Sequence, residues 1–371
     1  MIHISADQNL YKIKELVPPE TKLNLYDPSN GIPDLNDTDA LLVRTVTQIN
    51  ANTLPQPPQQ LRFIGTGSSG TDHIDEEYLQ QNGIRFSDAN GCNARAVAEY
   101  VITALLFWRE EQQLKEIPGK VGVIGVGKAG SAVVSLLEKF GIDCVAYDPP
   151  RERRDPGFTS ATIDEVLACE ILTFHVPLNR KGEFATYHWL NEEKLAGRQY
   201  QLIINAARGG VIDELELMKA YVEERVQGYI LDVWEEEPDF NTEIAKHAFL
   251  ATPHIAGYSE QSKINATKMV CDRLAEYFNL EPSKSQENND NQIIDLEDYL
   301  NYDLKKLLAR FHPMKEYDAA LRDLSDRPDK KVLFQNLRNE MPYRYEYPQL
   351  KIRKEVLDQF AELQLLGIQE I

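Results

Sequence analysis

Short apolar runs rich in branched residues recur through the first ninety residues, and polar or helix-like segments separate them. Short apolar runs bounded by polar segments are typical of buried strands, and strands that alternate with helices form parallel sheets. The pattern therefore predicts a small parallel-sheet lobe. Its predicted strands are "IHIS" (2–5), "KLNLY" (22–26), "ALLVRT" (40–45), "RFIGTG" (62–67) and "IRFSD" (84–88).

A second and stronger series of such runs begins at residue 121, and helical or loop sequence follows each of them. This alternation predicts a doubly wound sheet. Two longer stretches, 93–113 and about 260–278, are expected to be helices, and the first contains neither glycine nor proline. The predicted strands of the second series are "VGVIGV" (121–126), "DCVAYD" (143–148), "EILTFHVP" (170–177), "QLIINAA" (201–207), "GYILDVW" (228–234) and "FLATPHI" (249–255).

The composition changes near residue 282. The segment 282–292, "PSKSQENNDNQ", is polar and lacks bulky apolar residues, so we expect a flexible linker. The remainder, 293–371, is charged and rich in tyrosine, and it predicts a small mixed α/β or mostly helical module. A module of this size buries little core by itself and is expected to lean on a partner surface for stability.

The overall composition narrows the class of protein. A chain of 371 residues with 42% hydrophobic and 27% charged residues is typical of a soluble protein with two or three domains. The net charge of −19 argues against general binding to nucleic acid or to an anionic membrane. The four cysteines form no CxxC pair and the N-terminus lacks a signal-peptide pattern, so we expect a cytoplasmic protein with reduced thiols and no metal.

A nucleotide-binding motif opens the second series of strands. "VGVIGVGKAG" (121–130) fits G-x-G-x-x-G at Gly125, Gly127 and Gly130, directly after a predicted strand. These glycines permit a tight turn, close approach of a pyrophosphate and close packing of the following helix. Asp148 ends the next predicted strand, 18 residues after Gly130, where an acid binds the ribose of NAD. The motif predicts NAD rather than NADP, although Arg151 nearby could weaken the discrimination.

Three charged residues follow consecutive predicted strands: Arg208, Glu237 and His254. Ligands of doubly wound sheets bind at the carboxyl ends of the strands, so we expect these side chains to meet there. These residue types suit the oxidation of a 2-hydroxy acid. The arginine would fix the carboxylate, the histidine would take the hydroxyl proton, and the glutamate would orient the imidazole. Spacing alone leaves Glu235 and Glu236 as alternatives to Glu237, and His73 and His175 as alternatives to His254.

These motifs resemble those of the D-2-hydroxyacid dehydrogenases. The resemblance is carried by "INAARGGVIDE" (204–214), "LDVWEEEP" (231–238) and "TPHIAG" (252–257), set behind the glycine motif. The family's catalytic Arg, Glu and His fall on Arg208, Glu237 and His254, and the family's Glu precedes a proline, which selects Glu237 among the three glutamates. The resemblance implies an NAD-dependent enzyme.

Further segments resemble family members that act on a phosphorylated four-carbon hydroxy acid. The implied reaction is the NAD-dependent oxidation of 4-phospho-D-erythronate to 2-oxo-3-hydroxy-4-phosphobutanoate, in pyridoxal 5'-phosphate biosynthesis. Another hydroxy acid, such as phosphoglycerate, and an NAD-sensing scaffold with the same fold remain alternatives. The segments are "LLVRTVTQIN" (41–50), "GTDHID" (70–75), "GCNARAVAEYV" (91–101), "DPPR" (148–151), "TPHIAGYSEQSK" (252–263) and "LRNEMPYRYEY" (337–347).

The resemblance also implies an α/β fold with two doubly wound parallel-sheet lobes. A flavodoxin-like substrate lobe would comprise 1–94 and 258–285, and a Rossmann NAD-binding lobe 95–257. Residues 286–371 would form a small C-terminal α/β dimerisation module, so that the enzyme would be a homodimer.

The resemblance implies residues that contact the substrate and residues that contact NAD. The substrate phosphate also needs cations, which the motifs do not supply. For these we consider Arg44 and, across a dimer interface, Arg344, although a stacked structural arginine is an equal alternative for Arg344. The implied substrate contacts are Thr45, Ser68 and Tyr258. The implied NAD contacts are Gly125, Gly127, Gly130, Asp148, Val176, Ala206, Ala207, Arg208, Asp232 and Gly257.

Overall fold

The computed structural model describes residues 1–284, 292–294 and 302–371, and it divides into two compact units. The first unit comprises residues 1–93 and 259–290, and the second comprises 94–258 and 291–371. Most of the segment 282–292, which was expected to be a linker, lies outside the described residues.

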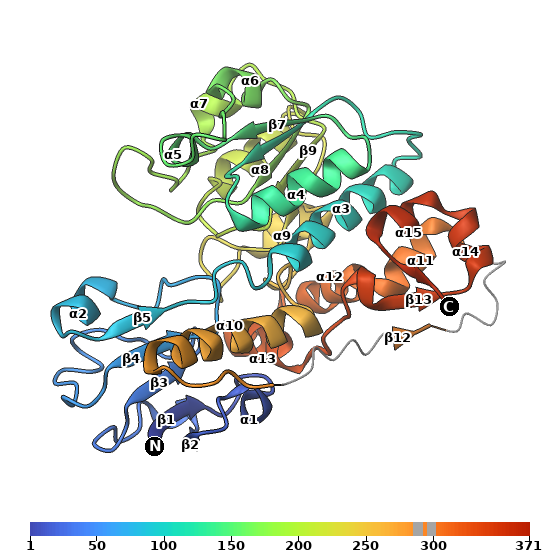
Figure 1. The fold of residues 1–371 in the computed structure, drawn as a ribbon. Helices are drawn as coiled ribbons and strands as arrows, with labels where there is room; N and C mark the ends of the chain where they lie inside the picture. Colours follow the sequence, from blue (N-terminus) through green and yellow to red (C-terminus); the bar gives the residue numbers. More distant parts are fainter. Residues whose placement is uncertain (285–291, 295–301) are drawn as a thin grey trace. The chain divides into compact units, whose positions relative to one another are not determined.

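The first unit is built on a five-stranded parallel sheet in the order β2-β1-β3-β4-β5 (Figure 1). This is the flavodoxin-like strand order, and the direction of winding reverses between β1 and β3. The expected first lobe is thereby confirmed as a doubly wound α/β sheet. Its strands are β1 (Ile2–Asp7), β2 (Thr21–Tyr26), β3 (Ala40–Val43), β4 (Phe63–Thr66) and β5 (Arg85–Ser87).

Helices cover both faces of this sheet. The long helix α10 (Glu260–Phe278) has the predicted bounds, and a capping box between Ser259 and Ser262 fixes its start. It lies so close to β4 that a Cβ on Gly65 would be 2.5 Å from the Val270 side chain. The shorter helices are α1 (Ile13–Leu16), the 3-10 turn η1 (Pro28–Asn30) and α2 (Glu76–Gln81).

The second unit contains a six-stranded parallel sheet in the order β11-β10-β9-β8-β6-β7 (Figure 1). The direction of winding reverses between β6 and β8, which is the switch point at which Rossmann-type sheets bind dinucleotides. The expected Rossmann fold is confirmed. The strands are β6 (Val121–Ile124), β7 (Cys144–Tyr147), β8 (Ile171–Phe174), β9 (Leu202–Asn205), β10 (Tyr229–Leu231) and β11 (Leu250–Ala251).

Both faces of this sheet are buried, which explains why its strands are continuously apolar in the sequence. Ile204 and Ile230 point into one core with α3 (Ala94–Glu111) and α4 (Lys128–Lys139). Their neighbours Ile203 and Leu231 point into the opposite core, because successive side chains of a strand alternate between faces. The remaining helices are α5 (Pro149–Glu152), α6 (Ile163–Leu167), α7 (Glu192–Leu195), α8 (Glu214–Val222) and α9 (Thr242–His247).

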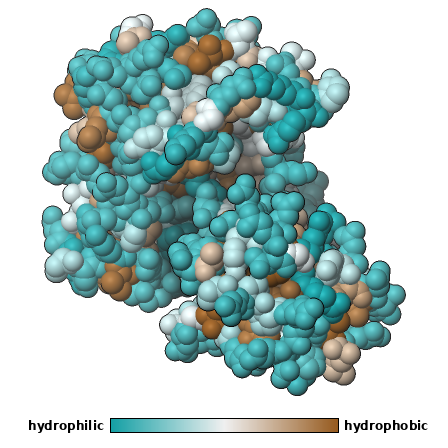
Figure 2. Space-filling model, turned by 90° about the vertical axis from the view of Figure 1, so that its left-hand side faces the viewer, coloured by the Kyte–Doolittle hydropathy of each residue, from teal (hydrophilic) through white to brown (hydrophobic). Residues whose placement is uncertain are grey.

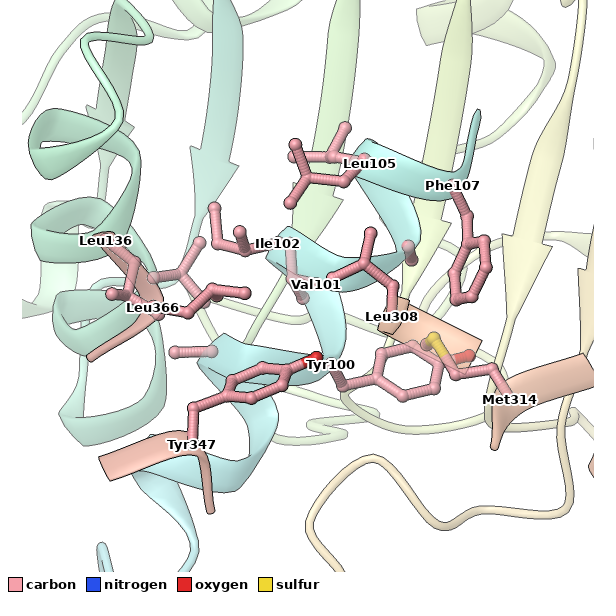
Figure 3. Close-up of a cluster of buried hydrophobic side chains, with 14 of the residues drawn as sticks. Tyr100, Val101, Ile102, Leu105, Phe107, Leu136, Leu308, Met314, Tyr347 and Leu366 are labelled. Carbon is pink, nitrogen blue, oxygen red and sulfur yellow. The ribbon is translucent and has the colours of Figure 1, made fainter. Parts of the chain in front are cut away.

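The C-terminal segment forms a helical module with a small parallel sheet in the order β12-β13-β14. Figure 3 shows Leu308, Met314, Tyr347 and Leu366 of this module in one hydrophobic cluster with the side chains of α3. The surface on which this small module leans is therefore α3 of the same chain. The elements are β12 (Gln292–Ile293), α11 (Leu304–Phe311), α12 (Met314–Arg322), α13 (Lys330–Glu340), η3 (Tyr347–Gln349), β13 (Leu350–Ile352), α14 (Lys354–Gln359), α15 (Ala361–Leu366) and β14 (Gln369–Glu370).

The surface is mainly polar on the face drawn in Figure 2, where hydrophobic residues are scattered among hydrophilic ones. Within the described part of the chain, every helix is too short or too polar to span a bilayer.

Candidate active site

The glycine motif forms a tight loop between β6 and α4. Gly125 has a φ of +85°, and a Cβ on Gly130 would lie 1.9 Å from the Gly125 carbonyl oxygen. Gly127 begins α4 without a side-chain cap, and a Cβ there would meet no described atom within 4 Å. A helix N-terminus with a small, open residue suits a pyrophosphate. The loop therefore fits a dinucleotide.

Asp148 follows β7 and lies against this loop. Its two carboxylate oxygens accept hydrogen bonds from the backbone N–H groups of Val126 (2.8 Å) and Arg151 (2.9 Å). Each oxygen keeps a further lone pair with which it can accept from a ribose hydroxyl. The guanidinium of Arg151 donates to the Val126 carbonyl and to Ser131 Oγ. The negative charge is thus oriented towards the loop, as NAD selectivity requires.

Val176 and His175 follow β8, next to the same loop. A Cβ on Gly125 would lie 2.6 Å from Val176 Cγ1, so a side chain at position 125 would displace Val176. Burial lowers the pKa of His175 to about 3, and its Nε2 lies 3.0 Å from Thr173 Oγ1. His175 is therefore a neutral imidazole at the cofactor side of the sheet.

Arg208 lies in a turn after β9 that Asn205 organises. The Asn205 side chain accepts from the Ala207 N–H (3.1 Å) and donates to the Arg208 carbonyl (3.0 Å). Ala206 and Ala207 are nearly buried, at 9% and 7% exposure. A Cβ on Gly209 would lie 1.7 Å from the Trp234 carbonyl oxygen, so the Arg208 turn packs directly against the loop that carries Glu237.

Glu237 and His254 form a hydrogen-bonded pair beyond β10 and β11. The distance from Glu237 Oε2 to His254 Nδ1 is 2.8 Å, and Glu237 Oε1 accepts from the Trp234 N–H at 2.9 Å. An ionised carboxylate only accepts, so Nδ1 carries the proton and donates it, which leaves Nε2 to face a ligand. The His254 side chain is 31% exposed.

The electrostatics of the pair keep Glu237 ionised. Burial raises the pKa of Glu237, but the charge and hydrogen bond of His254, together with the charge of Arg338, outweigh burial and lower the pKa below its usual value. A permanent carboxylate anion therefore lies beside the His254 imidazole.

The backbone of His254 is held in a sparsely populated conformation. Its φ is +58°, in the left-handed region, and its N–H donates to the carbonyls of Asp232 (2.6 Å) and Thr252 (3.0 Å). The Asp232 carboxylate accepts from the N–H groups of Ile255 (2.8 Å) and Ala256 (2.9 Å), next to Gly257. Burial raises the pKa of Asp232. Asp232 thus holds the backbone turn that carries His254.

Two residues that the sequence did not indicate complete this support. Thr252 Oγ1 donates to Asp232 Oδ1 at 2.6 Å and lies 2.7 Å from the Tyr100 hydroxyl, and the Trp234 indole donates to the Thr252 carbonyl at 3.0 Å. Thr252 precedes proline in an apolar segment and Tyr100 lies on an apolar helix face, so neither had a signal of its own.

The alternative residues have other partners. Glu235 Oε1 lies 2.6 Å from His188 Nε2, and Glu236 is exposed. His73 belongs to the first unit, lies 2.8 Å from Thr66 Oγ1, and burial lowers its pKa to about 4. Of the three glutamates after β10, the one hydrogen-bonded to His254 is therefore Glu237.

The substrate candidates of the first unit follow β3 and β4. Arg44 and Thr45 come directly after β3, and Arg44 Nε donates to Asp7 Oδ2 at 2.9 Å across the β1/β3 switch point. Ser68 follows β4, and its hydroxyl lies 2.7 Å from Thr66 Oγ1. The carboxyl ends of β3 and β4 thus carry Arg44, which is paired with Asp7, and the hydroxyls of Thr45, Thr66 and Ser68.

The two remaining candidates belong to the second unit. Tyr258 accepts a hydrogen bond from Arg338 Nη2 at 3.2 Å. Arg344 is paired with Glu99 at 2.7 Å, with side-chain exposures of 3% and 0%, and it also donates to the Ala96 carbonyl. These bonds tie the C-terminal module to α3 and neutralise the Arg344 charge inside the protein, so the structure favours a structural arginine over a phosphate ligand.

Comparison with known proteins agrees with this geometry. Residues 98–256 match the family described as "D-isomer specific 2-hydroxyacid dehydrogenase, NAD binding domain". The fold also matches the NAD+-bound 3-phosphoglycerate dehydrogenase of Entamoeba histolytica, with a TM-score of 0.59 and 23% identity, over 78% of this chain and 99% of the other. The chain belongs to the D-isomer-specific 2-hydroxyacid dehydrogenase family of NAD-dependent oxidoreductases.

Within this family the chain is similar over most of its length to proteins named erythronate-4-phosphate dehydrogenase. It is 36% identical to that of Proteus mirabilis, over 86% of each chain. It is 33% identical to that of Bacteroides thetaiotaomicron, over 92% of this chain and 97% of the relative. The resemblance inferred from the sequence motifs is confirmed, as is the expected dependence on NAD.

Proposed function

We propose that the protein oxidises 4-phospho-D-erythronate to 2-oxo-3-hydroxy-4-phosphobutanoate with NAD+, in pyridoxal 5'-phosphate biosynthesis. The observation that carries the reaction type is the pairing of Glu237 with His254 at 2.8 Å. The names of the relatives support the particular substrate.

Each catalytic residue has one task in this proposal. NAD+, when bound at the glycine loop, supplies the acceptor for the hydride that leaves C2 of the substrate. His254 Nε2 takes the proton of the C2 hydroxyl as a general base. Glu237 holds the ring in the tautomer that this requires and stabilises the imidazolium. Arg208 binds the substrate carboxylate and steadies the carbonyl oxygen as it forms.

The proposal extends to the other predicted contacts. Thr45, Ser68 and Arg44 of the first unit and Tyr258 of the second would bind the substrate. We further propose that the enzyme acts as a cytoplasmic homodimer that associates through residues 286–371. Size-exclusion chromatography with light scattering tests the dimer, since a monomer at micromolar concentration would contradict it.

Steady-state kinetics test the substrate. The purified protein is supplied with NAD+ and, in separate assays, 4-phospho-D-erythronate, D-erythronate or 3-phospho-D-glycerate. We expect the highest kcat/KM for 4-phospho-D-erythronate. Preference for 3-phospho-D-glycerate would reassign the substrate, and turnover of none of the three would support an NAD-sensing scaffold.

A further inference from the structure

Arg338 is a cation of the C-terminal module that lies at the candidate active site. It is carried by α13, outside the segment 98–256 that matches the family's NAD-binding domain. Its Nη2 donates to the Tyr258 hydroxyl at 3.2 Å, and its guanidinium carbon lies 5.7 Å from the centre of the Tyr258 ring. Arg338 also contributes to the lowered pKa of Glu237, which indicates that its charge lies near that carboxylate.

One face of α13 is fixed against the loops that carry the catalytic pair. Lys330 donates to the Phe240 carbonyl at 2.9 Å, and the Phe334 ring lies 5.9 Å from the Phe240 ring. Residues four apart lie on the same face of a helix, so Lys330, Phe334 and Arg338 form one stripe. The stripe begins at the loop after Glu237 and ends at Tyr258, so the packing of α13 places Arg338 beside Tyr258.

Tyr258 is supported from its other side by the same module. The Tyr343 ring packs edge-on against it at 6.2 Å. A cavity of about 10 Å³ is lined by Tyr258, His312 and Tyr343 among others, and it has room for about one water molecule. The module therefore packs closely behind Tyr258 and leaves little empty space there.

The bonding of Arg338 is incomplete. Within the described residues no carboxylate is paired with it, and its buried Nε has no hydrogen-bond partner. Arg338 donates to the neutral Tyr258 hydroxyl, whereas Arg344 of the same module forms a buried ion pair with Glu99. A partly buried guanidinium that has no directly bonded carboxylate and an unpaired Nε–H suits an anionic ligand.

We propose that Arg338, positioned by Tyr258, binds the terminal phosphate of the substrate and makes the enzyme selective for phosphorylated hydroxy acids. This inference rests on the proposed function, in which Arg208 binds the carboxylate and His254 receives the C2 proton. The phosphate lies two carbons beyond C2, so it needs a cation distinct from Arg208. Selectivity for phosphate would then be a property of the C-terminal module.

The test compares R338M and R338K with the wild type on 4-phospho-D-erythronate and on D-erythronate. We expect R338M to lower kcat/KM about 10- to 100-fold for the phosphorylated substrate, because it removes charge-assisted hydrogen bonds, and to change kcat/KM for D-erythronate less than about threefold. R310M, which removes an exposed arginine of the same module, is the control and should alter neither value. An equal effect of R338M on both substrates, or none on either, would overturn the proposal.

Two further measurements keep the test decisive. If R338M does not fold, R338K provides the test, since the lysine ammonium lacks the two parallel N–H donors of a guanidinium. We expect the preference of R338K for the phosphorylated substrate to fall about three- to tenfold. An unchanged preference overturns the proposal. If the wild type does not oxidise 4-phospho-D-erythronate, the proposed function fails by itself. In that case the binding of inorganic phosphate to the NAD+-loaded wild type and R338M is measured by calorimetry. If Arg338 binds phosphate, R338M should bind it at least about tenfold more weakly than the wild type. Equal binding by the two proteins, or no binding by either, would refute the proposal.

Discussion

Replacement of Glu237 by Gln is the sharpest test of the catalytic role proposed for Glu237 and His254, because the side chain keeps its size and loses its charge. Both carboxylate oxygens of Glu237 accept: one from the Trp234 N–H at 2.9 Å and the other from His254 Nδ1 at 2.8 Å. Glutamine has one acceptor oxygen and one NH2 donor, so it cannot satisfy both. If the oxygen stays with Trp234, the NH2 group faces Nδ1, and the neutral ring then carries its proton on Nε2. In that tautomer His254 cannot accept the substrate proton.

The magnitude follows from these contacts. A hydrogen bond to a charged group contributes about 1.5–3 kcal/mol, and each tenfold change in rate corresponds to about 1.36 kcal/mol. Loss of the bond alone therefore lowers kcat by about 10- to 150-fold, and the wrong tautomer lowers it further. We expect E237Q to reduce kcat by about 10²- to 10⁴-fold with little change in the KM of the substrate, because Arg208 is untouched.

The assay is steady-state kinetics, with NAD+ binding and thermal unfolding as checks of the fold. E236Q is the matched control, since Glu236 is the exposed neighbour of Glu237, and its kcat should stay within about twofold of the wild type. A folded E237Q that retains kcat within about fivefold of the wild type would refute the role assigned to the pair.

Further substitutions test the other groups. R208K should raise KM and lower kcat for the hydroxy acid, because a point charge does not copy the two parallel hydrogen bonds of a guanidinium; wild-type kinetics would remove Arg208 from the site. D148N should lower the ratio of kcat/KM for NAD+ to that for NADP+ by about tenfold or more, since it removes the charge that repels a 2'-phosphate, and parallel assays with the two cofactors measure it. Burial raises the pKa of Glu214 from 4.5 to about 8, so between these values the folded state binds more protons and the stability of the wild type falls as pH rises. E214Q removes this titration. Its free energy of unfolding relative to that of the wild type should increase from pH 5 to pH 8 by up to about 1.4 kcal/mol per pH unit, and then level off. Denaturant unfolding at several pH values measures this difference, and a difference that does not change with pH contradicts the assignment.

Much of the fold could be predicted because its elements follow from local patterns. Strands such as β6 and β9 are buried on both faces, so they are continuously apolar and are separated by polar segments. The bounds of α10 were predictable as well, since Ser259 marks its start and the periodicity ends at Phe278. The shortest helices, such as α7 (Glu192–Leu195), had no such signal, because four residues are too few to show a period.

Only part of the candidate site could be predicted, because its residues are brought together by contacts between distant segments. Spacing placed three glutamates after β10, and only resemblance selected Glu237. The structure gives the physical distinction, since Glu235 is bonded to His188, Glu236 is exposed and Glu237 is bonded to His254. Such pairings join segments distant in sequence, and local patterns do not contain them.

The arginines of the C-terminal module illustrate the same limit. The motif around "YRYEY" drew attention to Arg344, which the structure pairs with Glu99 of α3, 245 residues away in sequence. Arg338 lies six residues earlier in the same segment, on an ordinary amphipathic helix, and the resemblance gave it no role. Its position beside Tyr258 depends on how α13 packs against the Trp234–Phe240 loop, which is a tertiary contact.

The most direct test of the central claim is the fate of the hydrogen on C2. The protein is incubated with NAD+ and 4-phospho-D-erythronate that carries deuterium at C2, and the reduced cofactor and the acid product are analysed by mass spectrometry. The account predicts that the deuterium is found on the reduced nicotinamide and that C2 of the acid has become a ketone. Reduction of the cofactor without the label, or no reduction under conditions in which the protein is folded and binds NAD+, would contradict it.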